Sequence, residues 1–426
     1  MSRYSLSDVA GVTAVLKPSP FLLVLNLSAI LFLALLPSFS LPAVLTLVQR
    51  EWGMSSGQAG IVLASFQAGY IAAAVVALPL TDRVDARYVI AGGAALCCVS
   101  HLLFPLLAFD PLSGSAVRAL AGAGLGGVYM PGLRLASLVP AMKGRAVGTY
   151  VSSYLVGTAF SFAATGMLIA FMPWKAAYLW VSIASSLAFL ASYYLIRQPM
   201  PEAMTAVPKP RQVPAGEHSG QSRRAGLPSA LIIAAYVAHM WELYGLRSWL
   251  APFMVQVVGG GTPGAASKAA ALASVSVLLS AFSTIIGGWL SDRIGRITTA
   301  LAIMLVSGAC SLTFGWLPGQ SFFWLALVGV IYSLTVVADS PIFSTSITEL
   351  TPPERLGRMM AWQTFLGYGA ATVSPAVFGF VLDAFPGEAG WGWGFVTLGT
   401  GALLGPVFLL LMRRLPERER LCGGKG

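Results

Sequence analysis

Residues Gly288–Arg296 read GWLSDRIGR and end an apolar run in the second half of the chain. A shorter counterpart, Leu80-Thr81-Asp82-Arg83, ends an apolar run in the first half. The spacing from Asp82 to Asp292 equals the spacing from Pro131 to Pro341. Since two unrelated features repeat at one spacing, the sequence predicts two halves that are copies of one another.

The composition around this repeat is that of a membrane protein. Of the 426 residues, 56% are hydrophobic and only 10% are charged, and the mean hydropathy is +0.76. Soluble chains carry about 25% charged residues, so this chain has too few polar side chains to cover a globule in water. Disordered chains are charged and poor in aromatics. The composition therefore excludes a soluble enzyme and a disordered protein, and it predicts lipid around most of the chain.

Twelve apolar runs bounded by charged or turn residues are long enough to cross a bilayer, which takes about 20 residues. The runs of the first half are Phe21–Val48, Gly60–Leu80, Tyr88–Phe109, Ala116–Val139, Ala146–Met172 and Ala176–Ile196. The runs of the second half are Leu227–Val258, Ala269–Leu290, Thr298–Leu317, Phe322–Ile347, Met359–Phe385 and Gly394–Met412. Each should be an α-helix, because a segment in lipid must pair its backbone groups internally.

We therefore expect an all-α polytopic membrane protein with twelve transmembrane helices in two six-helix repeats. The first repeat occupies residues 1–196 and the second occupies residues 227–426. Residues 197–226 are polar and rich in proline, which is typical of a linker between domains. The sequence thus predicts two helical halves joined by a cytoplasmic linker.

The positive charges follow the predicted topology. A net charge of +10 would suit a nucleic-acid partner in a soluble protein. Here most Lys and Arg lie in the N-terminus, the linker, alternate connections and the C-terminus, as they do in cytoplasmic loops. We expect cytoplasmic termini, a multi-pass plasma (cytoplasmic) membrane location and no nucleic-acid partner. The four cysteines show no metal-binding spacing, so neither a metal nor a cofactor is expected.

The stretch GWLSDRIGR resembles the cytoplasmic signature of the major facilitator superfamily, Gly-x-Leu-(Ala/Ser)-Asp-Arg-x-Gly-Arg, at every defined position. The first-half copy keeps Asp82, Arg83 and Arg87 but has Leu78 and Asp85 where the signature has glycine. The resemblance extends over nearly the whole chain, because the number of runs, the central linker and the repeat agree with it. It implies a secondary transporter that works by alternating access and binds substrate between its halves.

Arg118, Gly122 and Gly124 in the fourth run are similar to another pattern of that superfamily, Arg-x-x-x-Gly-x-Gly. The bare physical interpretation of these glycines is close helix packing. No GxxxxGK[ST] phosphate loop is present, so ATP hydrolysis and an enzymatic function are not expected.

The two copies of the signature form a candidate gate motif. Its residues are Asp82, Arg83, Arg87, Gly288, Asp292, Arg293, Gly295 and Arg296. Acids and arginines at helix ends can make charge-assisted contacts that exist in one conformation and break in the other. The arginines alone could equally anchor helix ends at the lipid headgroups. Asp82 and Asp292 favour a latch, because topology does not require acids.

Ionisable residues inside spans are costly and by default mark a transport pathway. The predicted substrate-binding residues are Arg134, Tyr129, Arg247, Tyr236 and His239, and the predicted proton-coupling residues are Glu242 and Asp339. Tyr236, His239 and Glu242 share a helix face, because each lies three positions after the one before. Two alternatives stay open: a packing bond from Glu242 to Arg247 or His239, and a gate pair between Arg134 and Asp339.

Three arginines within spans, Arg118, Arg134 and Arg247, favour proton-coupled transport of a small organic anion, although Arg118 lies nearer the outer end and could snorkel. An exporter of lipophilic or cationic compounds is the alternative, since many aromatics and methionines could line a permissive cavity. The Gly-Pro signature of drug antiporters is not evident in the fifth run, where Thr158 follows Gly157. A non-transporting membrane receptor is a third possibility. The expected partners are a small anion, protons and the lipid bilayer.

Overall fold

The computed structural model describes residues 20–139, 143–198, 226–260 and 262–425. Almost all of them lie in helices, and this part of the chain contains no β-strand. The helices are α1 Pro20–Leu35, α2 Ser40–Trp52, α3 Ser56–Leu80, α4 Ala86–Leu107, α5 Pro111–Ser137, α6 Lys143–Ile169, α7 Trp174–Arg197, α9 Leu227–Val257, α10 Pro263–Ile294, α11 Arg296–Phe314, α12 Phe322–Thr335, α13 Ser340–Leu350, α14 Pro353–Ala384, α15 Glu388–Arg413 and the 3-10 helix η3 Pro416–Gly424. The expected all-α class is confirmed, and the predicted linker lies mostly outside the described residues.

Eleven segments of the described chain are long and apolar enough to cross a membrane. α1 and α2 together form one of them, Pro20–Trp52, and α12 and α13 form another, Phe322–Leu350. The fourth predicted run corresponds to α5, which has 27 residues but is not among the eleven. Arg134 and the many glycines of α5 lower its hydropathy. Eleven candidate spans are thus present, and the twelfth stays a prediction.

Two spans are interrupted near their middle, whereas the apolar runs predicted continuous helices. Residues 36–39 separate α1 from α2, and residues 336–339 separate α12 from α13. Neighbouring helices supply partners for the backbone at the first break. Arg118 Nη1 donates to the Ser38 carbonyl at 3.0 Å, and the Ser161 hydroxyl donates to the Leu36 carbonyl. Irregular backbone at membrane depth requires such partners.

The two prolines that share the repeat spacing, Pro131 and Pro341, differ in their effect. Pro131 lies inside the continuous helix α5, where the Tyr150 hydroxyl is 3.1 Å from the carbonyl oxygens of Val128 and Tyr129. Gly132 makes room for this hydroxyl, because a Cβ at that position would lie 2.2 Å from it. Pro341 lies instead in the first turn of α13, directly after the break. Only the second proline therefore accompanies an interruption.

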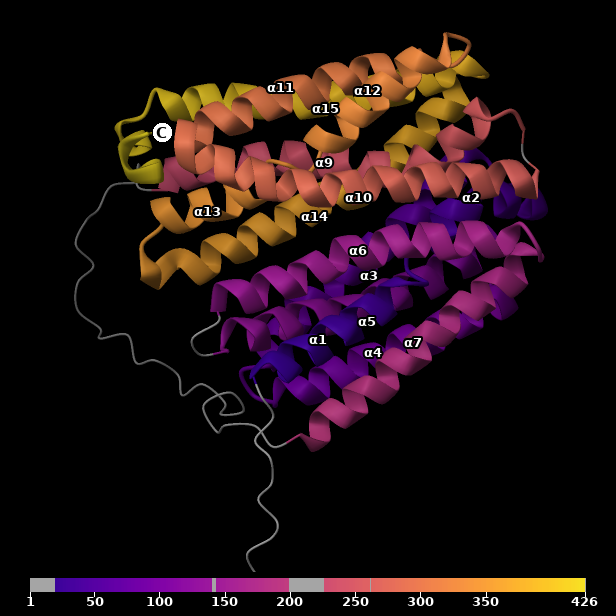
Figure 1. The fold of residues 1–426 in the computed structure, drawn as a ribbon, viewed down its shortest axis with the longest axis horizontal. Coiled ribbons are helices and arrows are strands. Elements are labelled where there is room, and N and C mark those ends of the chain that lie inside the picture. Colours follow the sequence, from indigo (N-terminus) through magenta and orange to yellow (C-terminus); the bar gives the residue numbers. More distant parts are fainter. Residues whose placement is uncertain (1–19, 140–142, 199–225, 261, 426) are drawn as a thin grey trace, which may run out of the picture.

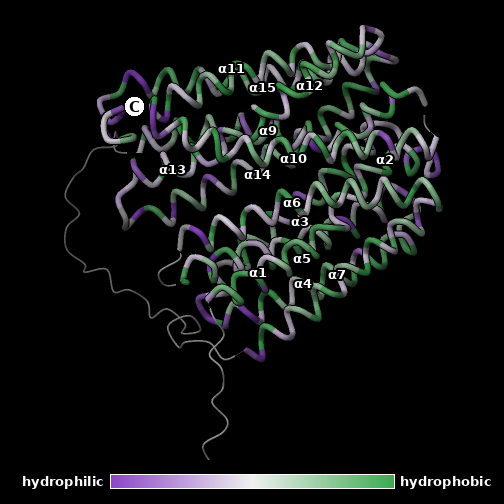
Figure 2. The backbone as a smooth tube through the Cα atoms, in the orientation of Figure 1, coloured by the Kyte–Doolittle hydropathy of each residue, from purple (hydrophilic) through white to green (hydrophobic). Residues whose placement is uncertain are grey.

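The outer surface of the bundle is apolar. On α10, for example, Phe282 and Ile285 are 66% and 71% exposed. Figure 2 shows hydrophobic residues along the helices and hydrophilic residues gathered toward the helix ends. Exposed apolar surface of this extent is unfavourable in water, so it fits the lipid environment expected from the composition.

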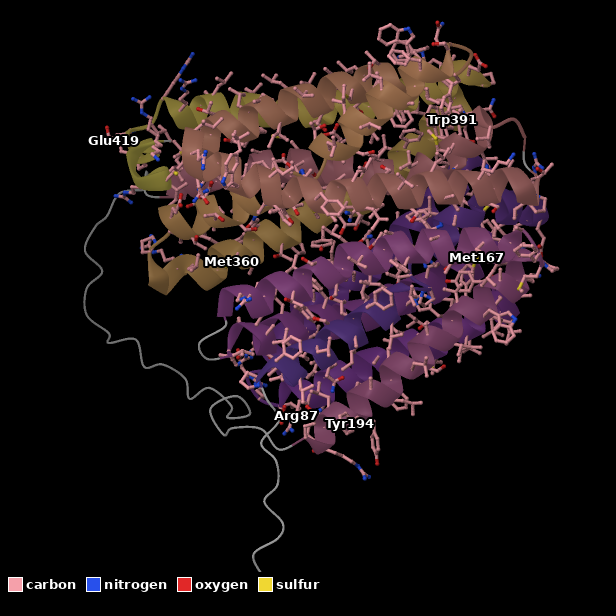
Figure 3. All side chains as sticks on the ribbon, viewed as in Figure 1. Arg87, Met167, Tyr194, Met360, Trp391 and Glu419 are labelled. Carbon is pink, nitrogen blue, oxygen red and sulfur yellow. The ribbon has the colours of Figure 1, made fainter. Side chains whose placement is uncertain are left out.

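The two halves lie side by side and diverge toward one end. In Figure 1, α1 and α3–α7 form one group and α9–α15 form the other, with α3 beside α14 and α6 beside α10. α2 lies between the two groups and packs against α9 and α6. We call the end that carries η3 the tail end and the other the far end; Figure 3 shows Arg87 and Glu419 at the tail end. The groups separate toward the tail end (Figure 1). At the far end they touch closely, since a Cβ on Gly379 would lie 2.2 Å from the Ser56 carbonyl oxygen.

Candidate substrate and gating sites

Five tyrosines meet where the two halves are in contact. This tyrosine cluster consists of Tyr70 on α3, Tyr129 on α5, Tyr154 on α6, Tyr244 on α9 and Tyr368 on α14. The ring centroids of Tyr70 and Tyr368 are 4.6 Å apart, and those of Tyr129 and Tyr154 are 5.4 Å apart. The hydroxyl oxygens of Tyr154 and Tyr244 are 3.4 Å apart. The cluster therefore joins the two halves through aromatic rings and phenol groups.

Sequence reasoning identified only Tyr129 of this cluster. The other four tyrosines lie on four different apolar helices, and no spacing along the chain links them. Tyr236, which was also predicted, lies next to the cluster on the His239 side, with its ring centroid 5.9 Å from that of His239. Only the packing of five helices brings the cluster together.

Arg247 lies beside the tyrosine cluster on α9, three residues after Tyr244. Its side chain is buried, and its guanidinium carbon is 5.8 Å from the centroid of the Tyr244 ring. Arg247 Nη2 makes no hydrogen bond, and the described residues provide no ion pair for this side chain. A small cavity of about 10 Å³ adjoins it, lined also by Phe162 of the first half and Ser280 of the second. A buried, uncompensated cation at the contact between the halves is suited to bind an anion.

His239 and Asp339 form a buried pair in the second half. His239 Nδ1 lies 2.8 Å from Asp339 Oδ1, and His239 Nε2 lies 2.7 Å from the Ser340 hydroxyl. Asp339 is the last residue of the break between α12 and α13. The break thus positions a carboxylate against α9, where both imidazole nitrogens are engaged. These two predicted site residues are therefore in direct contact.

Glu242 makes no hydrogen bond or ion pair with either His239 or Arg247. Its Oε2 accepts a hydrogen bond of 2.9 Å from Ser307 on α11, while its Oε1 has no partner among the described residues. Positions two apart on a helix face different sides, so Glu242 is directed into the second half while Tyr244 faces the first. Neither of the packing bonds considered for Glu242 is present. The structure leaves a buried carboxyl that faces the Ser307 and Tyr332 hydroxyls and has no cation as a partner in the described chain.

Arg134 is placed at the tail end and not at the tyrosine cluster. Its Nη1 lies 2.8 Å from Asp82 Oδ1 and also contacts the Thr81 hydroxyl. The gate pair considered between Arg134 and Asp339 is absent, because each has a different partner. The long side chain of Arg134 reaches the end of α3, where an acid is available. Arg134 therefore belongs with the gate motif in this conformation, and Arg247 alone remains as the arginine at the contact between the halves.

The second-half gate motif is a network within that half. Arg296 contacts Asp292, and its Nη2 lies 2.9 Å from Glu349 Oε1 on α13. Gly295 forms the turn between α10 and α11 with a φ of +100°, a conformation that favours glycine. Arg293 lies over the Trp289 ring at 4.0 Å. The chain terminus completes the network, since the backbone N–H of Cys422 donates to Glu349 Oε2 at 3.1 Å.

The first-half motif is likewise closed within its own half. Arg87 pairs with Asp85 at 2.7 Å and donates to the carbonyls of Ile196 and Gln198 at the end of α7. Arg83 is exposed. Gly288 is open, as nothing lies within 4 Å of a Cβ built there. In the described chain, no gate-motif contact crosses between the halves in this conformation.

Asp292→Asn is expected to leave folding intact and to slow transport by about fivefold or less, because an exposed ion pair contributes about 0–1 kcal/mol. The Asp292 side chain is 65% exposed. Initial uptake rates and the ratio of inward-facing to outward-facing molecules measure the effect. Glu388→Gln, an exposed acid at the far end, is the control. Wild-type values for both readouts in Asp292→Asn would show that the motif only fixes topology.

A contact that does cross between the halves lies at the far end. Asp383, near the end of α14, accepts from the Ser55 hydroxyl at 2.7 Å and from the backbone N–H groups of Ser56 and Gly57 at 2.7 and 2.8 Å. These donors form the N-terminus of α3, where a carboxylate is favoured by the helix dipole. Asp383 was an acid inside the eleventh predicted run, so it could have been singled out from the sequence. It holds the far end closed.

Asp383→Asn is expected to open the far end more often, because three charge-assisted bonds between the halves lose the charge. Spin labels at Gln58 and Glu388 should report a broader and longer distance distribution. Asp110→Asn is the matched control, since Asp110 accepts from the Ser113 N–H at the start of α5 within one half. The hydrogen bonds from the Ser113 hydroxyl and from its backbone N–H hold the pKa of Asp110 below its usual value. Equal distributions in Asp383→Asn and wild type would contradict a gating contact.

Two buried residues of the first half act in packing. His101 contacts the Ser38 hydroxyl at 3.3 Å and the Tyr178 hydroxyl at 3.1 Å. Arg118 is only 2% exposed and lies 4.4 Å from the Phe66 ring centroid. Arg118 therefore does not snorkel to the surface, because the break between α1 and α2 offers its guanidinium a carbonyl inside the bundle.

A separate apolar groove of about 1010 Å³ lies between α9, α14 and α15. Trp241 and Trp362 line it, and none of the charged candidates does. Within the described chain, no group of three or more His, Cys, Asp or Glu is arranged to hold a metal. The candidate substrate site therefore lies at Arg247 and the tyrosine cluster.

Comparisons with known proteins agree with this architecture. A sequence model of the Major Facilitator Superfamily matches residues 27–368, and a second match covers residues 264–424. The gentisate transporter of Corynebacterium glutamicum is 24% identical over 86% of this chain and 82% of its own length. A probable sulfoacetate transporter of Cupriavidus necator is 23% identical over 83% of this chain and 85% of its own. The inward-facing, occupied structure of a bacterial homolog of the human lysosomal transporter Spinster has a TM-score of 0.73 at 16% identity, covering 93% of this chain and 97% of that one.

Proposed function

Since the chain belongs to the Major Facilitator Superfamily, we propose that it is a secondary transporter that carries a small organic anion by alternating access. The observation that carries the substrate class is Arg247, a buried cation without an ion-pair partner in the described chain, at the contact between the halves. An arginine in such a low-dielectric site attracts a carboxylate or sulfonate strongly. Relatives named for gentisate and sulfoacetate support an organic anion.

The proposed architecture has twelve transmembrane helices in two six-helix halves, 1–196 and 227–426, with a linker between them. The length of α5 supports it as the twelfth span, because 27 residues exceed the bilayer thickness. Contacts between the halves at the far end and their divergence at the tail end support an inward-facing conformation. The substrate would then enter and leave at the tail end.

The proposed transport is coupled to protons. Glu242 is a buried carboxyl that bonds to Ser307 and has no ion-pair partner in the described chain. His239, which pairs with Asp339, lies three residues before it on α9. An ionised carboxyl enclosed without a cation is costly to bury, and a neutral one costs much less. Uptake and release of a proton at Glu242 would therefore couple to conformational change. The His239 and Asp339 pair is the second candidate.

We place the tail end in the cytoplasm and the protein in the plasma membrane, because Lys and Arg gather at that end. A cysteine at Arg358, which is exposed at the tail end, should then be unreachable by impermeant thiol reagents in intact cells. A cysteine at Gln320, in the exposed turn between α11 and α12, should be labelled. The reverse pattern would overturn the orientation.

Competition for uptake into proteoliposomes tests the substrate class. We expect small organic carboxylates and sulfonates to compete with one another, and hydrophobic cations to have no effect. Neutral analogues of the same acids should fail, because they cannot pair with Arg247. Competition by hydrophobic cations alone would replace this proposal with an exporter of cationic compounds.

A further inference from the structure

We propose that the transported anion carries a planar aromatic ring, with its carboxylate on Arg247 and its ring against the tyrosine cluster. This inference rests on the proposed anion transport and adds the substrate class. It makes the site one for aromatic carboxylates, in particular those with a hydroxyl on the ring.

The tyrosine cluster supplies flat faces from both halves. Tyr70 and Tyr368 approach across the contact at 4.6 Å between centroids, and Tyr244 and Tyr368 approach at 5.6 Å. These distances are those of favourable aromatic pairs. A ring that enters when the halves move apart can replace one such pair with two contacts of the same kind, one on each half. An aliphatic chain cannot reproduce this exchange.

The position of Arg247 fixes the orientation of the substrate. Its guanidinium already lies near the ring of Tyr244, at 5.8 Å from the centroid. An anion paired with Arg247 is therefore next to an aromatic face, so a carboxyl attached directly to a ring suits the geometry. The described residues place no second unpaired arginine at the cluster, because Arg134 pairs with Asp82 and Arg118 bonds to the Ser38 carbonyl. One cation favours a single carboxylate.

The phenol groups of the cluster explain the expected ring hydroxyl. The Tyr154–Tyr244 and Tyr244–Tyr368 oxygen distances are 3.4 and 3.5 Å, which is long for hydroxyl pairs. The buried Tyr70 hydroxyl has the Tyr368 hydroxyl as a neighbour but makes no well-aligned hydrogen bond with any described residue. Buried hydroxyls that are weakly bonded or unbonded gain from a polar substituent on the substrate. A hydroxyl on an aromatic carboxylate would supply it.

Binding of four small probes to the purified, full-length transporter tests this inference. The probes are benzoate, 4-hydroxybenzoate, cyclohexanecarboxylate and benzamide. We expect both aromatic acids to bind at least tenfold more tightly than cyclohexanecarboxylate, which keeps the carboxyl and loses the flat ring. We expect 4-hydroxybenzoate to bind more tightly than benzoate, because its hydroxyl can bond to the phenol groups of the cluster. We expect benzamide, which keeps the ring and loses the charge, not to bind.

Two variants of one residue separate the ring from its hydroxyl. Tyr368→Leu should reduce the preference for benzoate over cyclohexanecarboxylate to about threefold or less, whereas Tyr368→Phe should keep that preference and lose the preference for 4-hydroxybenzoate over benzoate. Binding of cyclohexanecarboxylate to both variants serves as the folding control. If Tyr368→Leu does not bind it, the matched Tyr154→Leu and Tyr154→Phe pair takes its place.

The failures of the two proposals are distinguishable. Equal binding of benzoate and cyclohexanecarboxylate to the wild type would overturn the aromatic class and leave anion transport standing. Failure of both aromatic acids to bind at millimolar concentration would also overturn the aromatic class. Benzamide binding as tightly as benzoate would overturn anion recognition itself.

Discussion

Arg247→Gln is expected to weaken binding of the transported anion by about 30-fold or more, because losing one partner of a buried charge pair costs about 2–5 kcal/mol. Arg247→Lys should weaken it less, since lysine keeps the charge but not the bidentate geometry. Equilibrium binding and initial uptake rates measure both effects.

Arg134→Gln is the matched control for this result. Arg134 is also an arginine within a predicted span, but its partner is Asp82 at the tail end. Its replacement should leave anion affinity unchanged. Arg247→Gln should also keep or raise the thermal midpoint of the ligand-free protein, because it removes an unpaired buried charge. Unchanged affinity in Arg247→Gln would remove the main support for an anionic substrate.

Glu242→Gln is expected to abolish accumulation driven by a pH gradient while retaining substrate binding and counterflow exchange. The amide fixes the neutral form of the side chain and still accepts the hydrogen bond from Ser307. The transport cycle would then turn without moving a proton. Uptake into proteoliposomes with an imposed pH gradient, compared with exchange at equal pH, measures the difference.

Glu51→Gln provides the control for this prediction, because Glu51 is a half-exposed acid that pairs with Lys175 at 2.6 Å. It should accumulate substrate as the wild type does. Accumulation by Glu242→Gln at the wild-type level would assign coupling to the pair of His239 and Asp339. If Asp339→Asn also accumulates substrate normally, neither Glu242 nor Asp339 carries the coupling proton.

The helical class and its family could be predicted because their signals are local. GWLSDRIGR and its counterpart at Leu80–Arg83 carry the resemblance, and apolar runs of sufficient length mark the spans. The breaks at residues 36–39 and 336–339 could not be predicted, because they depend on partners such as Arg118 on a different helix. Hydropathy along a chain contains no information about such partners.

The candidate site was predictable only where charge is costly. Arg247, His239, Glu242 and Asp339 could be identified because burial of ionisable groups needs a reason. The same rule did not distinguish Arg247 from Arg134, since the acid that engages Arg134 lies on another helix. Tyrosines carry no comparable penalty in apolar helices, so the cluster became visible only when the halves were packed together.

The docked C-terminus offers a fixed attachment point for optical measurements. Leu421 is fully buried, and the Cys422 N–H bonds to Glu349, so η3 moves with the second half. A fluorescent protein fused directly after η3 would therefore move with the second half and would not be attached through a flexible linker. Paired with a dye at Tyr194, which is exposed at the tail end of the first half (Figure 3), it would turn each transport cycle into a change in energy transfer readable in living cells.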